Sequence, residues 1–468
     1  MTKQTIHEKM FFERKDKTIF GLSEKYAHDY LDKVSGRKVY PEESAIENLS
    51  VFDEDLPERS SNTEEIIEML HQYGSPATVA QVGGRYFGFV NGGIVPSGLA
   101  AKILSDFWDQ NTALQVMSPI ASRLETVVEK WLRLLFDLPD DTVAGFVSGT
   151  STAIFCGLAA ARYRILKNAD WDVNQKGLFG APGVRIVAGR EAHSTVIKAI
   201  GLLGLGQDNI EWVKSDEQGR IIPGLIPELD SGTILILQAG NVNSGSFDPL
   251  EEIIGKANRT GAWVHIDGAF GLWAGAAEKL KYLTTGIGKA DSWSVDGHKT
   301  LNAPYDSGII LCRDKEALSS ALHMSGAYIV LGDQRDGMFY TPEMSRRARI
   351  VELWATMKFL GKSGMDEMIY GLHQRALQFA GELAEHGFEI LNDVVFNQVL
   401  VRCETDELTG KILKKIQDLR VCWCGGSRWK DKDVIRISVC SWATTPEDIT
   451  LSVESFVKAR DCFTGPKS

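Results

Sequence analysis

One lysine follows the end of an apolar run and could act as a nucleophile. Lys299 closes the tetrad Asp-Gly-His-Lys at 296–299, directly after residues 292–295, whose pattern is typical of a buried strand. An ammonium group near a protein core must be paired or lose its proton, and a neutral amine can condense with an aldehyde. A solvated lysine in the turn after a strand has the same local sequence, so the tetrad alone favours a surface turn.

Three other segments place polar groups at strand ends or helix starts. Residues 148–153 open a helix of small and apolar residues, where Thr150, Ser151 and free backbone N–H groups could hold an anion such as phosphate. An ordinary capped helix explains that segment equally well. His193 precedes another helix and, alone, is more typical of a cap or a core residue than of a catalyst. Asp267 ends an apolar run, where a carboxylate needs a cationic partner.

Together these four features match the requirements of one cofactor, pyridoxal phosphate. An anion cradle, an aromatic ring, a carboxylate and a lysine follow one another in that order along the chain. Lys299 would form the Schiff base, and Asp267 would keep the pyridine nitrogen protonated so that the ring can accept electrons. The His193 imidazole can stack on one face of that ring, and the small Ala269 leaves room on the other.

The elements that must position these groups alternate in type. Helical patterns separate short apolar runs that predict strands at 184–188, 210–214, 233–237, 262–266, 292–295 and 308–311. This alternation predicts an α/β fold with a mostly parallel sheet covered on both faces. Ligands of such sheets bind where the loops gather at the carboxyl ends of the strands.

We predict three parts along the chain. Residues 1–75 form an N-terminal arm, 76–363 a large cofactor-binding domain and 364–468 a small C-terminal domain. The arm is polar, with a helix expected to run through Ile66 and Leu70 to a break at Gly74 and Pro76. In the small domain we expect strands at 388–391, 398–402 and 434–439, after a long helix at 346–360 and a second helix from about 364. The stretch 317–337 has mixed polarity and suggests a mobile segment.

Composition excludes several classes of protein. Lys and Arg total 51 against 62 Asp and Glu, a net charge of -11 that argues against a nucleic-acid partner. Seven scattered cysteines favour a reducing, cytoplasmic compartment over a disulfide framework. Cys422 and Cys424 have no further ligands nearby in sequence, so we expect no metal. The N-terminus lacks the apolar core of a signal peptide, and no run approaches the ~20 apolar residues of a membrane helix.

The motifs together resemble the group II pyridoxal-phosphate decarboxylases, which include the glutamate and aromatic amino acid decarboxylases. The resemblance extends from about residue 20 to 458 and includes residues 118–125, 246–249, 345–347 with Trp354, and 435–438 with Thr444 and Thr445. It implies the pyridoxal-phosphate-dependent transferase fold, fold type I. Its parts are a large domain with a mostly parallel seven-stranded sheet, a small C-terminal α/β domain and an N-terminal helical arm. It also implies a homodimer with a shared active site.

The resemblance also assigns roles to residues. It implies that Lys299 is the Schiff-base lysine, Asp267 the pyridinium partner and His193 the stacking ring. Thr150, Ser151 and His298 would hold the phosphate.

Three further positions carry weaker assignments. Asn241 falls where the family often has a threonine near the cofactor, and Asp296 where it often has an asparagine. Arg436 can face the substrate carboxylate, although a structural ion pair is an equally good interpretation.

The chain departs from the family on the loop before the Arg-Arg pair. The decarboxylases carry a tyrosine there that protonates the substrate carbon after carbon dioxide leaves. Counting back from Arg346, the expected place is 337–339, which contains no tyrosine. Tyr340 and Tyr328 are near but out of register, and Tyr340 is our candidate. Without this donor, the carbanion could be trapped by oxygen or by an aldehyde.

The predicted function is decarboxylation of an L-amino acid to its amine. Phe87, Phe89 and Asn91, in the glycine-rich loop 83–93, and the segment 320–340 are expected to line the substrate pocket. Their aromatic content favours an apolar or aromatic side chain. A second interpretation keeps the cofactor and changes the reaction to decarboxylation-dependent oxidative deamination, aldol-type cleavage or transamination. A third is a catalytically silent protein that keeps the fold as a binding module.

Overall fold

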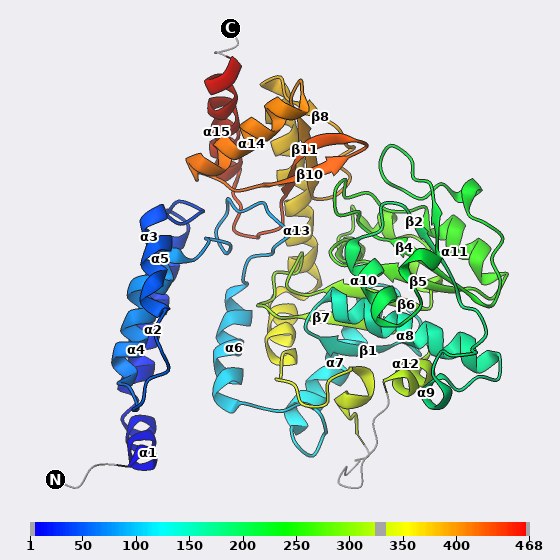
Figure 1. Ribbon diagram of the computed structural model, residues 1–468, viewed down its shortest axis with the longest axis horizontal. Helices are drawn as coiled ribbons and strands as arrows, with labels where there is room; N and C mark the ends of the chain where they lie inside the picture. Colours follow the sequence, from blue (N-terminus) through cyan, green and yellow to red (C-terminus); the bar gives the residue numbers. More distant parts are fainter. Residues whose placement is uncertain (1–4, 323–333, 465–468) are drawn as a thin grey trace.

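The computed structural model describes residues 5–322 and 334–464 of the chain. Figure 1 shows a large α/β body, a smaller unit above it and a helical arm beside it. Residues 323–333, which include Tyr328 and most of the segment predicted to be mobile, lie outside the described residues. The boundaries at 75 and 363 remain predictions.

The large domain is built on one seven-stranded sheet. Its strands are β1 (Val143–Val147), β2 (Arg185–Gly189), β3 (Ile210–Val213), β4 (Thr233–Gln238), β5 (Trp263–Asp267), β6 (Ser292–Asp296) and β7 (Gly308–Cys312). They are ordered β1-β7-β6-β5-β4-β2-β3. Only β7 runs antiparallel to its neighbours, β1 and β6. The predicted mostly parallel sheet is therefore confirmed.

Two apolar layers cover the sheet. Pro119–Leu135 (α7), Leu250–Asn258 (α11) and the first part of α13 pack in one core cluster with inward-facing residues such as Leu235 and Val264. On the other face, Thr150–Asn168 (α8), Ser194–Leu202 (α10) and Lys315–Ala321 (α12) pack against residues such as Ile186. Both faces are buried, which explains why the strands read as continuous apolar runs.

The small domain has a four-stranded antiparallel sheet in the order β10-β11-β9-β8. Its strands are β8 (Glu389–Ile390), β9 (Gln398–Arg402), β10 (Gly425–Trp429) and β11 (Lys432–Ser438), covered by α14 (Asp406–Leu419) and α15 (Pro446–Thr464). Strand β10 was not predicted, because its two glycines, serine and arginine lack an apolar pattern. Strand β1, a short run between two helices, was not predicted either.

A long helix, α13 (Ile350–Glu385), joins the two domains. It corresponds to the two helices predicted at 346–360 and from 364, which meet at a break where Gly361 has φ +58°. The start predicted at 346 is wrong by four residues. Arg346 and Arg347 precede the helix in ion pairs with buried carboxylates, and Arg349 pairs with the half-buried Asp306.

The arm consists of α1 (Ile6–Asp16), α2 (Thr18–Val34), α3 (Glu43–Glu47), α4 (Thr63–Met69) and the short α5 (Ser75–Ala77). The break was predicted at Gly74 and Pro76, and the helix ends at Ala77, after α4 continues through one wider turn, Leu70–Gly74, into α5. The chain then enters the body through α6 (Pro96–Trp108). No helix among the described residues is long and apolar enough to cross a membrane.

Candidate active site

Lys299 lies beside a buried carboxylate at the carboxyl end of β6. The strand ends at Asp296, and the turn that follows brings Lys299 Nζ to 3.0 Å from Asp296 Oδ2. The side chain of Asp296 is 2% exposed and that of Lys299 21%. Lys299 is therefore ion-paired and largely buried, unlike the solvated turn lysine that its local sequence favours. A buried pair is weak evidence for stability, so its chemistry matters more.

His298 presents an N–H group beside the same carboxylate. Its Nδ1 accepts a hydrogen bond from the Ser307 backbone N–H at 3.1 Å, so the proton of the neutral ring is on Nε2. Nε2 is 3.6 Å from Asp296 Oδ2. Burial lowers the pKa of His298 and favours the neutral ring. The Tyr305 ring stacks on the imidazole with centroids 4.1 Å apart and fixes its plane.

The N-terminus of α8 forms the predicted anion cradle. Gly149 precedes the helix and gives it no side-chain cap, and Thr150 Oγ1 is buried without a hydrogen-bond partner among the described residues. A Cβ on Gly149 would lie 3.5 Å from His298 Cε1 and 3.7 Å from Asp296 Oδ1. A helix end with open amides, an unpaired hydroxyl and a histidine N–H nearby suits a phosphate group. Ser151, the next residue, is exposed.

His193 and Asp267 come from neighbouring parts of the sheet edge. His193 is the N-cap of α10, and its Nδ1 accepts from the Thr195 backbone N–H at 3.2 Å, which leaves the proton on Nε2. Asp267 ends β5 and accepts from the Ala269 N–H at 3.2 Å.

The electrostatics place these side chains in one cluster. Burial lowers the pKa of His193, and the charges of Asp267 and Lys299 also act on it. Burial raises the pKa of Asp267, which the positive charge of Lys299 opposes. The structure therefore brings together the imidazole, the carboxylate and the lysine that the sequence predicts. Asp267 makes no direct ion pair among the described residues, so its carboxylate can still meet a cation.

The predicted substrate residues lie around this cluster. Asn91 Oδ1 accepts from the Tyr305 hydroxyl at 3.0 Å, and that tyrosine stacks on His298. Phe89 is 62% exposed and stacks on Trp423 of the small domain with centroids 5.5 Å apart. Arg436, on β11, reaches the Val242 carbonyl at 3.4 Å, and its charge also acts on His193.

Two predicted residues have other surroundings. The Asn241 side chain forms hydrogen bonds with nearby backbone groups. Its Oδ1 accepts from the Asn243 N–H at 2.9 Å, and its Nδ2 donates to the Glu191 carbonyl at 3.3 Å. It shapes the loop that carries His193.

Tyr340 is not brought to the cluster. It is 7% exposed in the core beneath β1, with the Arg335 guanidinium 4.2 Å from its ring centroid.

Tyr305 is a site residue that sequence reasoning missed. It lies six positions after Lys299, on the return from the turn to β7, and contacts both His298 and Asn91. Pro304, the residue before it, predicts a turn, but no local pattern predicts that the Tyr305 ring folds back over His298.

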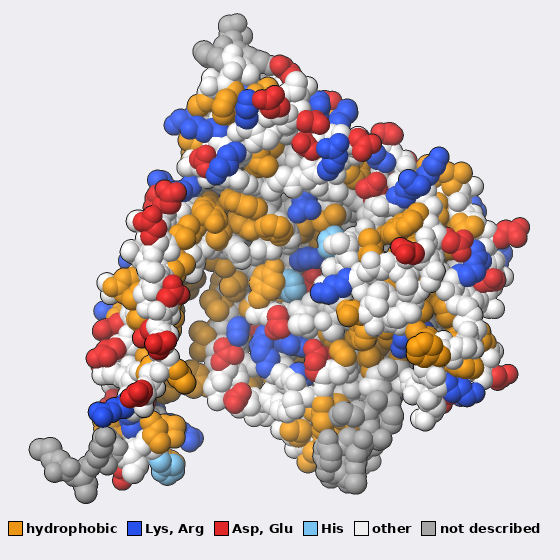
Figure 2. Space-filling model, in the orientation of Figure 1, with side chains coloured by type: hydrophobic (Ala, Val, Ile, Leu, Met, Phe, Trp, Pro, Cys, Tyr) orange, Lys and Arg blue, Asp and Glu red, His pale blue; other side chains and the backbone are white. Residues whose placement is uncertain are grey.

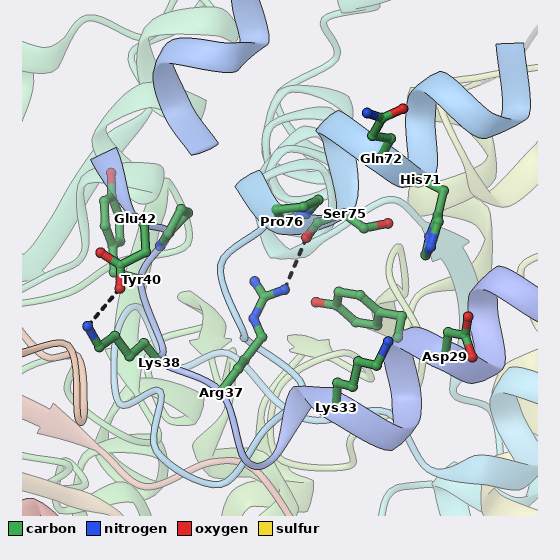
Figure 3. A pocket seen from close by; sticks show the side chains of 12 residues that line it. Asp29, Lys33, Arg37, Lys38, Tyr40, Glu42, His71, Gln72, Ser75 and Pro76 are labelled. Carbon is green, nitrogen blue, oxygen red and sulfur yellow. Dashed lines mark hydrogen bonds and ion pairs between the residues drawn. The ribbon is translucent and has the colours of Figure 1, made fainter. Parts of the chain in front are cut away.

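The surface agrees with this placement. Figure 2 shows histidine and basic side chains in a hollow of the body, between the small and large domains. A separate pocket of about 520 Å³ lies on the arm, lined by residues that include Lys33, Arg37 and His71 (Figure 3). Arg37 donates there to the Ser75 carbonyl at 3.0 Å. None of the predicted site residues lines this pocket.

The fold and the site define a class of enzyme. A mostly parallel sheet carries an anion cradle, a buried carboxylate and an ion-paired lysine at the carboxyl ends of its strands. These groups fit pyridoxal phosphate, because the unpaired Thr150 hydroxyl and the Asp267 carboxylate each lack the partner that the phosphate and the ring nitrogen would supply.

Comparison with known proteins identifies the family. The pyridoxal-dependent decarboxylase conserved domain matches residues 46–404. The chain therefore belongs to the pyridoxal-dependent decarboxylases, which are carboxy-lyases that use pyridoxal phosphate. It is 26% identical to the aromatic-L-amino-acid decarboxylase of Bacillus atrophaeus over 87% of each chain. It is 28% identical to an acidic amino acid decarboxylase of Mus musculus over 67% of this chain and 59% of that protein.

Solved structures agree on the fold. Mouse CSAD superposes with a TM-score of 0.86 at 21% identity, covering 95% of this chain and 98% of that one. The Oryza sativa TDC with PLP and tryptamine gives a TM-score of 0.87 at 19% identity, covering 96% and 98%. The predicted fold type I architecture is confirmed.

Proposed function

We propose that this enzyme removes the α-carboxylate of an L-amino acid with an apolar or aromatic side chain and releases the amine. The cluster at the carboxyl ends of the strands carries the proposal. There Lys299, Asp267 and His193 act on one another beside the uncapped N-terminus of α8.

When bound, pyridoxal phosphate supplies an aldehyde for an amine and a ring that draws electrons from the α-carbon. Lys299 would bind the aldehyde carbon, and Asp267 would hold a proton at the ring nitrogen. The neutral His193 ring would stack on the cofactor opposite Ala269.

The phosphate would be held at the start of α8. Thr150 and Ser151 would donate hydroxyls and backbone N–H groups, and His298 would donate from Nε2. Asp296 would hold the Lys299 ammonium until the amine is needed, because its carboxylate lies 3.0 Å away. Asn241 would set the loop that carries His193.

The substrate side supports an apolar or aromatic amino acid. Phe89 offers an exposed ring backed by Trp423, and Asn91 lies beside it at the cluster. Arg436 would pair with the substrate α-carboxylate, because its guanidinium contacts the Val242 carbonyl and has no carboxylate partner among the described residues.

A second candidate reaction releases an aldehyde after carbon dioxide leaves. Its support is the loop before Arg346. At Gly337, a Cβ would lie 2.0 Å from Arg346 Nη2 and 2.8 Å from the Thr112 carbonyl, so no larger residue fits there. Tyr340 packs into the core. Slow protonation of the substrate carbon would let oxygen intercept it.

One assay separates these reactions. Carbon dioxide, amine, ammonia and oxygen are measured together across a panel of aromatic, aliphatic and acidic L-amino acids. We expect amine and carbon dioxide in equal amounts without oxygen uptake. Oxygen uptake with ammonia and aldehyde would support the second candidate, and the absence of carbon dioxide with every amino acid would remove both.

We also propose a homodimer in the reducing cytoplasm. Support for the dimer comes from exposed apolar side chains on the arm and α6, including Phe11, Phe12, Ile103 and Phe107. Figure 2 shows hydrophobic side chains along the gap between arm and body. Support for the compartment comes from the odd number of cysteines, seven, scattered along the chain.

A further inference from the structure

Three segments that carry proposed site residues meet at the side chain of Asn302. One is the turn that begins at Lys299, the second is the loop that carries Asn91, and the third is the segment after β11, the strand of Arg436. Asn302 is completely buried, at 0% exposure. A buried amide must satisfy its polar atoms within the protein, so its contacts matter for the fold around it.

Both ends of the amide are fully used. The nitrogen Nδ2 has two hydrogens and faces three carbonyl oxygens, those of Thr300 (2.8 Å), Cys440 (3.0 Å) and, more distantly, Lys299 (3.3 Å). The oxygen Oδ1 accepts from the backbone N–H groups of Gly93 (2.5 Å) and Trp442 (2.9 Å). Because carbonyls face the nitrogen and N–H groups face the oxygen, the surroundings fix the orientation of the amide. An aspartate would turn an acceptor toward the three carbonyls.

The backbone of Asn302 also suits this position. Its φ is +60°, a left-handed conformation that favours asparagine and glycine. Its own carbonyl accepts from the Val95 N–H at 3.0 Å, so main chain and side chain both hold the same loop.

The segments around the amide are packed too closely to shift independently. A Cβ on Gly92 would lie 2.2 Å from the Lys299 carbonyl oxygen, and one on Gly93 would lie 2.8 Å from Ser441 Oγ. Trp442 Nε1 adds a hydrogen bond to the Ile94 carbonyl at 3.0 Å. Loop, turn and small domain thus form one junction with Asn302 at its centre.

We propose that Asn302 is a positioning residue that sets the spacing between the Lys299 amine and the groups that bind the substrate. The inference rests on the proposed roles of Lys299, Asn91 and Arg436. Those three side chains belong to separate segments, and the Asn302 side chain ties the main chain of all three together. Catalysis depends on such spacing, because a displacement of about 1 Å can cost about a hundredfold in rate.

The test is Asn302→Gly in the full chain loaded with pyridoxal phosphate. Glycine keeps the left-handed backbone and removes only the amide. We expect kcat to fall by about a hundredfold, KM to rise, and bound cofactor to dissociate faster when followed through its visible absorbance. Asn302→Asp should be worse than glycine, because its carboxylate faces the three carbonyls.

The control is Asn397→Ala. Asn397 is also 0% exposed and donates to the Val439 carbonyl at 3.1 Å, but this bond is internal to the small domain. Its loss should lower stability to chemical unfolding while kcat, KM and cofactor release stay close to wild type. Trp442→Phe, at an exposed position, removes only the bond to Ile94 and should shift KM and cofactor release in the same direction by a smaller factor.

The outcomes separate two failures. Wild-type kcat, KM and cofactor release in Asn302→Gly would overturn the positioning role, as would equal losses in Asn397→Ala. If Asn302→Gly does not fold, unchanged KM and cofactor release in Trp442→Phe would overturn it. If the wild type carries no cofactor that borohydride fixes to Lys299, the proposed function fails and the positioning role falls with it.

Discussion

The side chains around Lys299 differ in whether they can hold a proton. Burial lowers the pKa of His193 and of His298 and favours their neutral rings. Burial raises the pKa of Asp267, so its ionised form depends on a nearby cation. The ring nitrogen of the cofactor, once protonated, would be that cation. In the proposed function, the carboxylate at the end of β5 would therefore be the residue on which electron withdrawal depends.

Replacing Asp267 by asparagine should separate binding from chemistry. Asparagine keeps the shape but cannot hold a proton on the ring nitrogen as a carboxylate does. We expect Asp267→Asn to retain the visible band of bound cofactor and to lose about a hundredfold or more in kcat. Spectra and carbon dioxide release from the same preparation provide the measurement. A variant with nearly wild-type kcat would remove Asp267 from this role.

Tyr340 should prove dispensable for catalysis. Its ring is buried under the Arg335 guanidinium, and it packs in the core rather than beside Lys299. We expect Tyr340→Phe to keep amine production within about twofold of wild type, because the ring packing is preserved. Steady-state assays of amine formation test this. A loss of a hundredfold or more would restore Tyr340 as the proton donor.

Part of the site was predictable because strand ends determine where side chains meet. Asp267 and Lys299 follow apolar runs, and Thr150 and His193 precede helices, so a parallel sheet brings them to one edge. The stacking of Tyr305 on His298 depends on how the turn after Lys299 folds back, which no local pattern records. The burial of Tyr340 depends equally on packing against β1, a strand that the sequence pattern did not reveal.

At the scale of elements, β5 carries a buried histidine as well as Asp267. His265 is 0% exposed, with Nδ1 2.8 Å from Ser292 Oγ on β6. Helix α8 packs so closely that a Cβ on Gly157 would lie 2.7 Å from the ring. Burial lowers the pKa of His265 to about 3. The central strands are therefore built around an imidazole that stays neutral.

This histidine should make the fold sensitive to acid. The unfolded chain takes up the proton near pH 6.5, whereas the folded chain resists it down to about pH 3, so stability falls as pH drops below 6.5. One such group lowers the free energy of unfolding by about 1.4 kcal/mol for each pH unit below 6.5, down to the folded-state pKa. Urea unfolding at pH 6.5 and 4.5 should show a shallower loss in His265→Asn than in wild type. Equal losses would exclude His265 as the cause.

The whole molecule presents an apolar surface that one chain leaves uncovered. Helix α6 exposes Ile103, Leu104 and Phe107, and the Phe107 ring meets Phe20 of the arm at 5.3 Å. Large exposed apolar surfaces mark interfaces between proteins. A second copy of the chain is the partner that we propose.

A charge on this surface should separate the copies. We expect Phe107→Asp to sediment as a monomer under conditions where wild type is a dimer, and to lose activity with the shared site. Phe179→Asp is the matched control, because Phe179 is 97% exposed and follows α9 (Val173–Lys176) in the chain, and Figure 1 shows α9 on the opposite side of the body from the arm. A wild type that sediments as a monomer, or a dimeric Phe107→Asp, would contradict the proposed homodimer.

The most direct measurement concerns Lys299 itself. Wild-type enzyme loaded with pyridoxal phosphate is reduced with borohydride and digested, and the peptides are identified by mass. We expect the phosphopyridoxyl group on the peptide that contains Lys299 and no labelled peptide from Lys299→Ala. Label on a different lysine, or an active wild type without label on Lys299, would contradict the assignment of this lysine as the residue that binds the cofactor.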